Sequence, residues 1–170
     1  MSDSHLVLAG GGHSHALVLR RWAMHPSFRP SGLITLVNCQ STLLYSGMVP
    51  GLISGNYERE EISVDLRSLC EGSGVSFILA EIIGIDRAKN LLLLDNRPPI
   101  FFNQLSLNVG AEIFGEVDLS DSGEENNLLE QIKPLEKAVS WINNQDREFL
   151  LNESTPLKVV GSGMTGIEVS

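Results

Sequence analysis

The chain has 170 residues, 42% of them hydrophobic, and its 12 Lys and Arg against 21 Asp and Glu give a formal net charge of −9. This length and composition predict one medium domain, or one domain with the start of another, and exclude a disordered or fibrous chain. The negative charge repels phosphate backbones, so the sequence argues against generic nucleic-acid binding.

Targeting and redox signals are sparse. No apolar run reaches the roughly 20 residues that cross a bilayer. The apolar start at Leu6 soon meets glycines and histidines, so no signal peptide is predicted. Cys39 and Cys70 stand far apart, with neither a CxxC nor a zinc-ligand spacing. We therefore expect a reduced, cytoplasmic setting.

The first 38 residues predict a strand, a glycine turn, a helix and a second strand. Residues 5–9 (HLVLA) form a short apolar run typical of a buried parallel strand. Three glycines follow at residues 10–12, and residues 15–24 carry apolar side chains at helical spacing until Pro26 ends the helix. Residues 32–38 (GLITLVN) repeat the buried-strand pattern. This order is a βαβ unit with parallel strands.

The next part of the chain predicts a loop and a short helix. Residues 40–60 form a long connection, and a connection of that length in a compact domain is usually functional. Asp65 is placed to cap a short helix through Cys70, which Gly72 and Gly74 end.

The second half predicts more strands, an acidic loop and a long helix. Residues 75–86 and 91–95 are apolar runs that indicate a hairpin or meander. Residues 115–127 are acidic and poor in core side chains, which predicts a solvated loop. Residues 134–151 predict a long helix with proline in its first turn, and residues 157–160 a further buried strand.

The glycines after the first strand suggest a phosphate-binding turn. Glycine allows a positive φ and a close backbone approach, and the helix that follows offers free N–H groups and the positive end of its dipole. Gly10 and Gly12 fill the first two positions of G-x-G-x-x-G, but His15 stands in the third, where we expect it to push the helix outward or tilt it. Asn38 stands where an acidic residue is expected. The alternative is a flexible strand-to-helix turn without a ligand.

A second turn is more specific. Residues 161–166 (GSGMTG) form a complete G-x-G-x-x-G after a buried strand. Two such turns suggest two nucleotide sites, one for a flavin nucleotide and one for a nicotinamide nucleotide.

The sequence resembles the pyridine nucleotide-disulfide oxidoreductase superfamily, and within it the type II NADH dehydrogenase-like branch. The segments that carry the resemblance are VLAGGGHSHALVLRRW, ITLVNCQSTLLYSGMVPGLISG, ISVDLRSLCEGSGVSFILAEIIGID and LSLNVGA. They are similar to a subgroup often fused to selenide, water dikinase (selenophosphate synthetase). The resemblance implies an α/β fold: a Rossmann-like three-layer FAD/NAD(P)-binding domain with a parallel sheet and a small antiparallel meander.

The resemblance also implies the sites of two cofactors, FAD and NAD(P)H. The first turn would bind the FAD diphosphate, and the end of the second strand would lie by the adenosine ribose. A later strand would meet the adenine, and a segment before the NADH domain would close over the FAD. The residues are, in that order, Gly10, Gly12, His13 and Ser14; Asn38; Ala80 and Glu81; Gly110 and Ala111. NADH would bind at Gly161, Gly163 and Gly166.

On this resemblance the chain is the N-terminal part of a longer protein. Residues 1–113 would be the first segment of the FAD domain, residues 114–155 the acidic loop and connecting helix, and residues 156–170 the start of the NAD(P)H domain. We expect the 170 residues alone to be inactive and to bind FAD weakly or not at all.

The side chains present restrict the chemistry. With one cysteine after the second strand, no dithiol relay forms within the chain, so electrons would pass to a non-disulfide acceptor such as a quinone. Cys39 is expected to be a half-buried structural thiol, with a redox role as the alternative. His13 and His15 lack an accompanying acid, so no metal site is predicted. Instead His13 and Ser14 would offer donors to a ligand, while His15 packs under the turn. No catalytic side chain is assigned.

The predicted function is an FAD-dependent NAD(P)H oxidoreductase that reduces a small-molecule acceptor. Two alternatives stay open: a selenium-metabolism oxidoreductase fused to selenophosphate synthetase, and a non-catalytic redox-sensing nucleotide-binding module. Expected partners are the small-molecule acceptor and a fused selenophosphate synthetase domain, with peripheral membrane contact through regions outside this chain and no nucleic acid.

Overall fold

The structure is a computed structural model that describes residues 4–110. These residues belong to two compact units, one containing residues 4–43 and 63–110 and the other residues 44–62. The predicted acidic loop, the long helix and the second glycine turn lie outside the described residues. Within residues 4–110, no helix is long and apolar enough to cross a membrane.

A four-stranded parallel sheet forms the centre of the larger unit. Its strands are β1 (His5–Ala9), β2 (Leu33–Asn38), β5 (Ser76–Leu79) and β9 (Gln104–Leu107), in the order β5-β2-β1-β9. All three pairings are parallel. The two central strands are the apolar runs that predicted them, because a strand covered on both faces needs apolar side chains on both.

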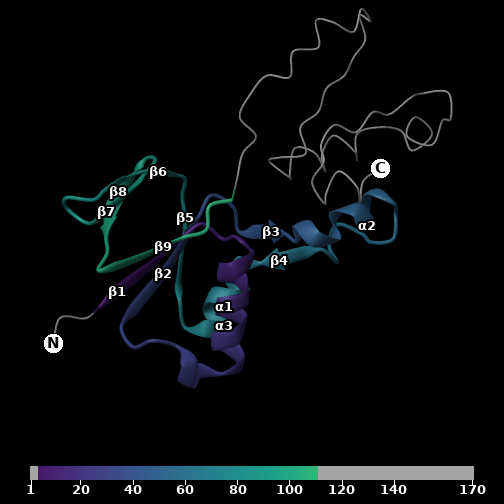
Figure 1. Cartoon of the computed structure of the whole chain (residues 1–170), viewed down its shortest axis with the longest axis horizontal. Helices are drawn as coiled ribbons and strands as arrows, with labels where there is room; N and C mark the ends of the chain where they lie inside the picture. Colours follow the sequence, from purple (N-terminus) through teal and green to yellow (C-terminus); the bar gives the residue numbers. More distant parts are fainter. Residues whose placement is uncertain (1–3, 111–170) are drawn as a thin grey trace, which may run out of the picture. The chain divides into compact units, whose positions relative to one another are not determined.

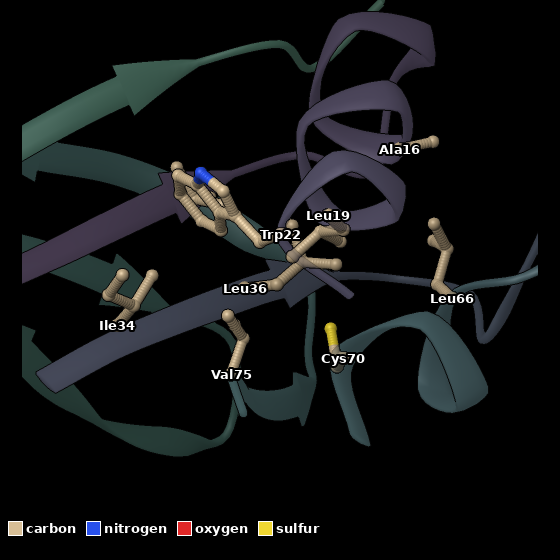
Figure 2. Packing of buried hydrophobic residues seen from close by; sticks show 9 residues of the cluster. Ala16, Leu19, Trp22, Ile34, Leu36, Leu66, Cys70 and Val75 are labelled. Atoms are coloured by element: carbon tan, nitrogen blue, oxygen red, sulfur yellow. The ribbon is translucent and has the colours of Figure 1, made fainter. Parts of the chain in front are cut away.

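Two helices cover one face of this sheet (Figures 1 and 2). Helix α1 (His13–Met24) is followed by the 3₁₀ turn η1 (Pro26–Phe28), and α3 (Leu66–Ser73) follows later in the chain. The buried residues of α1 recur at helical spacing and pack with β2 and α3 in one apolar cluster. Its buried members are Leu8, Ala16, Leu19, Trp22, Ile34, Leu36, Leu66, Cys70 and Val75.

The ends of α3 follow from capping chemistry. Asp65 Oδ1 accepts hydrogen bonds from Arg67 N at 2.9 Å and from Ser68 N at 3.2 Å, as the sequence predicts for an N-cap. Gly74 ends the helix in the left-handed region, with φ at 65°. The predicted stop at Gly72 is wrong: Gly72 lies inside the helix, because only Gly74 takes the left-handed conformation that closes the last turn.

An antiparallel meander covers the other face. It consists of β6 (Ile82–Asp86), β7 (Leu91–Leu94) and β8 (Arg97–Phe101). Its side chains form a second core with the sheet, whose buried members are Val7, Ala9, Val37, Ala80, Leu92, Leu94 and Phe102. The predicted three-layer α/β fold with a parallel sheet and an antiparallel meander is therefore confirmed.

Residues 75–86 do not form one strand of a hairpin, as the apolar pattern suggests. They supply β5 of the parallel sheet and β6 of the meander, with a break at residues 80–81. Ala80 N donates to Asn38 O at 3.0 Å, which continues the contact with β2 before the chain changes sheet. Both halves are apolar, so composition alone does not reveal the break.

The segment predicted as a long connection also contains regular structure. Strand β3 (Thr42–Leu44) pairs with β4 (Ser63–Asp65), and η2 (Ser46–Met48) leads into the short helix α2 (Val49–Ile53). In the smaller unit, Leu44, Val49 and Ile62 are buried together in a separate apolar cluster.

Candidate functional site

The first glycine turn lies at the carboxyl edge of the sheet, the edge formed by the last residues of β1, β2, β5 and β9 (Figure 1). The turn follows β1, Asn38 ends β2, and Asn108 follows β9. The order of strands reverses here, because the chain passes from β1 to β2 on one side and returns with β9 on the other. Open α/β sheets bind their ligands outside such an edge, at such a reversal.

Gly10 is required by the close approach of β9. Its φ is +89°, and its N donates to Val37 O at 2.8 Å. A Cβ at this position would lie 2.6 Å from Val109 Cα, a separation that real Cβ atoms do not show. Both the backbone angle and the contact therefore exclude any side chain here.

Gly12 is required by Asn108. A Cβ on Gly12 would lie 2.6 Å from Asn108 Cγ. Gly12 N donates to Asn108 O at 3.1 Å, and Asn108 N donates to Ala9 O at 2.8 Å, so the turn is bonded to the end of β9 on both sides. Contacts within the chain therefore account for Gly10 and Gly12 without a ligand, as the alternative of an ordinary turn proposes.

Asn38 holds the middle of the turn. Its Oδ1 accepts from Gly11 N at 2.8 Å, and its Nδ2 donates to Gln40 O at 2.8 Å. The structure thus places Asn38 beside the glycine turn. Its contact with a ribose stays a prediction.

His15 lies under the turn, as the sequence predicts, and is 5% exposed. Its Nδ1 is 2.7 Å from Gly10 O, a carbonyl that only accepts, so we place the ring proton on Nδ1. Its Nε2, 2.8 Å from Ser106 Oγ, then accepts from that hydroxyl. Burial lowers the pKa of His15 below its usual value, and the bond to Gly10 offsets this in part. Because both ring nitrogens have partners, the turn accommodates a buried histidine at the third glycine position.

The start of α1 favours an anion. His13 and Ser14 are exposed in its first turn, and that turn contains no acidic residue. Backbone N–H groups and the helix dipole give such an end a partial positive charge. In the orientation that pairs donors with acceptors, Asn108 Oδ1 accepts from Ser14 N at 3.1 Å and from His15 N at 3.3 Å. A neutral side-chain amide thus caps the helix.

Sequence reasoning missed Asn108. The signal available was a polar residue directly after strand β9, which ends at Leu107, and two residues before Gly110. Its importance becomes visible only when β9 is known to lie beside β1, because Asn108 lies 96 positions after Gly12 in the sequence.

The remaining predicted residues lie on the segments that follow β5 and β9. Ala80 is buried and is joined to the end of β2 through Asn38 O. Glu81 is exposed, and its carbonyl accepts from Asp95 N at 2.9 Å. Gly110 follows β9 with φ at +87°. Ala111, Gly161, Gly163 and Gly166 lie outside the described residues.

The two cysteines differ in environment. Cys70 is buried in the helical core; burial, with a smaller contribution from the Asp65 carboxylate, raises the pKa of its thiol to about 12. Cys39 is exposed, so the expectation of a half-buried thiol is wrong: it lies beyond the last residue of β2, outside the packed layers. Residues 4–110 contain no group of three or more His, Cys, Asp or Glu side chains suited to a metal ion.

The fold and this edge define a Rossmann-type α/β domain, whose layers leave a glycine turn and a helix start at the carboxyl ends of the strands. Comparison of the sequence with family models and with curated proteins gives no match. Solved structures do match.

Three of them are oxidoreductases. The chain is similar to sulfide:quinone oxidoreductase from Aquifex aeolicus, with 24% identity over 69% of this chain and 27% of that one, at a TM-score of 0.56. NADH:rubredoxin oxidoreductase from Clostridium acetobutylicum is 18% identical over 98% of this chain and 40% of that one, at a TM-score of 0.63. NDH2 from Plasmodium falciparum, solved in complex with NADH, is 15% identical over 66% of this chain and 23% of that one, at a TM-score of 0.54. These likenesses establish the fold, and this chain spans less than half of each protein.

Proposed function

We propose that this chain is the FAD-binding part of an FAD-dependent NAD(P)H oxidoreductase. The observation that carries the proposal is the helix start of α1 at the carboxyl edge of the sheet, next to the glycine turn and Asn38. The fold, shared with oxidoreductases whose names include NADH and a quinone, supports it. We assign the chain to the pyridine nucleotide-disulfide oxidoreductase superfamily and its type II NADH dehydrogenase-like branch on the sequence resemblance.

The residues at this edge fit the diphosphate of FAD. The donors at the start of α1 are backbone N–H groups, and no acidic side chain of the first helical turn repels an anion. His13 and Ser14 would hold the diphosphate, beside the turn that contains Gly10 and Gly12. Asn38 would contact the ribose and Ala80 the adenine. When bound, FAD supplies the acceptor for a hydride from NAD(P)H, and the protein supplies binding and orientation.

We propose a small-molecule acceptor without a disulfide, such as a quinone. The chain has two cysteines in all, and Cys70 is buried in the helical core, so Cys39 has no partner within the chain for a dithiol relay. The donor would be NAD(P)H bound at residues 161–166.

The finer assignment rests on the sequence alone. We propose that the chain belongs to the subgroup fused to selenophosphate synthetase, and that the protein is cytoplasmic with peripheral membrane contact through regions outside this chain. A non-catalytic redox sensor is the competing interpretation that the following experiment separates.

The test uses the protein at its full natural length. Purified protein is examined for a flavin absorption spectrum, then mixed anaerobically with NADH or NADPH, and finally with the water-soluble quinone menadione. We expect bound flavin, bleaching on addition of the nicotinamide, and recovery of the spectrum with the quinone. Flavin that is bound but never reduced would favour the sensor, and a protein that takes up no flavin when refolded with excess FAD would overturn the proposal.

A further inference from the structure

Asn108 connects the end of β9 to the start of α1 in two ways. Its backbone bonds to Ala9 O and Gly12 N fix its main chain. Its side-chain oxygen accepts from Ser14 N and His15 N. The side chain lies so close to Gly12 that any larger residue there would overlap it.

The backbone N–H groups that donate to the Asn108 side chain lie in the first turn of α1, where a diphosphate would also accept hydrogen bonds. The N–H groups of Gly10, Gly11 and Gly12 donate to Val37 O, Asn38 Oδ1 and Asn108 O, and Ala16 N donates to Gly12 O. These bonds build the turn itself. The N–H groups of Ser14 and His15 instead donate to a side chain that rotates without disturbing the backbone. They are therefore donors that the fold can release to a ligand.

From this geometry we propose that Asn108 is an internal cap of the diphosphate site: it holds the helix start in the ligand-free protein and is replaced by a phosphate oxygen when the dinucleotide binds. This inference rests on the proposed function. The exchange favours the ligand because a charged acceptor forms hydrogen bonds about twice as strong as a neutral one, and because the helix dipole attracts negative charge. Asn108 would thus set the affinity of the site.

If a phosphate oxygen replaces Asn108, variants at this position should rank in opposite orders for stability of the free protein and for FAD affinity. Asn108→Ala removes the cap from the free protein only, so the free protein becomes less stable while FAD binds about three- to tenfold more tightly, the effect of one lost helix cap. Asn108→Asp keeps the shape and supplies a charged cap. That cap stabilises the free protein and repels the diphosphate, so FAD should bind about tenfold or more weakly.

The experiment compares wild type, N108A and N108D at full natural length, each prepared free of flavin. FAD affinity is measured by titration of flavin fluorescence, and stability by urea unfolding without FAD. Hydrogen–deuterium exchange of the peptide that starts α1 reports the cap directly, because Ser14 N and His15 N should exchange faster in N108A. The charge-matched control is Asn103→Asp, at the other end of β9, where Asn103 Oδ1 accepts from His5 N at 2.7 Å. It should bind FAD as wild type does.

Each outcome decides something different. The ranking N108A, wild type, N108D from tightest to weakest, with the reverse order of stability, supports the cap. FAD binding that weakens in N108A overturns it and makes Asn108 a ligand contact, while the proposed function stands. Unchanged exchange at Ser14 and His15 in N108A also overturns the cap. If none of the four proteins binds FAD, the proposed function fails together with the exchange.

Discussion

The carboxyl edge and the amino edge of the parallel sheet contain similar residues with different roles. At the carboxyl edge, Gly10 has a positive φ and Asn108 ties β9 to the turn after β1. At the amino edge, formed by the first residues of the same strands, Gly32 has φ at +100° and Asn103 ties β9 to the start of β1. A glycine with positive φ next to a strand and an asparagine across from it therefore do not by themselves indicate a ligand site.

The difference lies in what each asparagine oxygen accepts. Asn103 Oδ1 accepts from His5 N, at the start of β1. Asn108 Oδ1 accepts from Ser14 N and His15 N, in the first turn of a helix. Because α1 returns the chain from the carboxyl edge to β2, the positive end of its dipole lies at the carboxyl edge. The helix start, rather than the glycines, separates a candidate anion site from an ordinary strand end.

The largest expected effect comes from adding a methyl group at each edge. Gly10→Ala would force an unfavourable φ and place Cβ against the backbone of Asn108 and Val109, which is held by bonds to Ala9 and Gly12. We expect it to lower the free energy of unfolding by about 3–5 kcal/mol. Gly32→Ala would also force an unfavourable φ, and its Cβ would clash with the carbonyl oxygen of Ser4, which accepts from Leu33 N; because it meets one backbone residue rather than two, it should cost about 2–3 kcal/mol. Urea unfolding measures both.

FAD affinity sharpens this first comparison. Gly32→Ala should bind FAD as wild type does once folded. Gly10→Ala should lose binding even at about 10–20 °C, where folded proteins are typically most stable. Equal costs at the two edges would show that the carboxyl edge is no more constrained than the amino edge.

A smaller effect is expected from the two asparagines that accept from backbone N–H groups of the turn and of β1. Asn38→Ala removes the acceptor of Gly11 N, and Asn103→Ala removes the acceptor of His5 N. Asn38→Ala also removes the donor to Gln40 O, so it should lower the free energy of unfolding by about 2 kcal/mol, and Asn103→Ala, which loses one hydrogen bond, by about 1 kcal/mol. Only Asn38→Ala should weaken FAD binding, because it loosens the glycine turn. Loss of affinity in both, or in neither, would contradict a site confined to the carboxyl edge.

Much of the fold follows from local sequence signals. The run HLVLA predicts β1 with its observed bounds, and Asp65 predicts the start of α3, because strand burial and helix capping depend on residues close together in the chain. The division of residues 75–86 between two sheets was not predictable in this way, because it depends on which strand each half meets. Cys39 was misjudged for the same reason: its exposure depends on where β2 ends relative to the layers.

The candidate site was predictable where one segment carries it. Gly10, Gly12 and the helix start lie within a few residues of each other and form a known pattern. Asn108 was not predictable, because its importance arises from the pairing of β9 with β1. The contact between His15 and Ser106 was not predictable for the same reason, since Ser106 lies on β9.

The smallest expected effect concerns pH and compares the histidines at the two edges. Burial lowers the pKa of His15, so the unfolded chain binds a proton below pH 6.5 that the folded chain resists. The free energy of unfolding should therefore fall as the pH drops from 6.5 towards the lower pKa of the folded state. His15→Gln should flatten this part of the profile. His5→Gln, at the amino edge where the ring contacts Thr35 Oγ1 at 2.9 Å, is the matched control and should retain it. A profile unchanged by His15→Gln would show that the buried ring does not resist protonation.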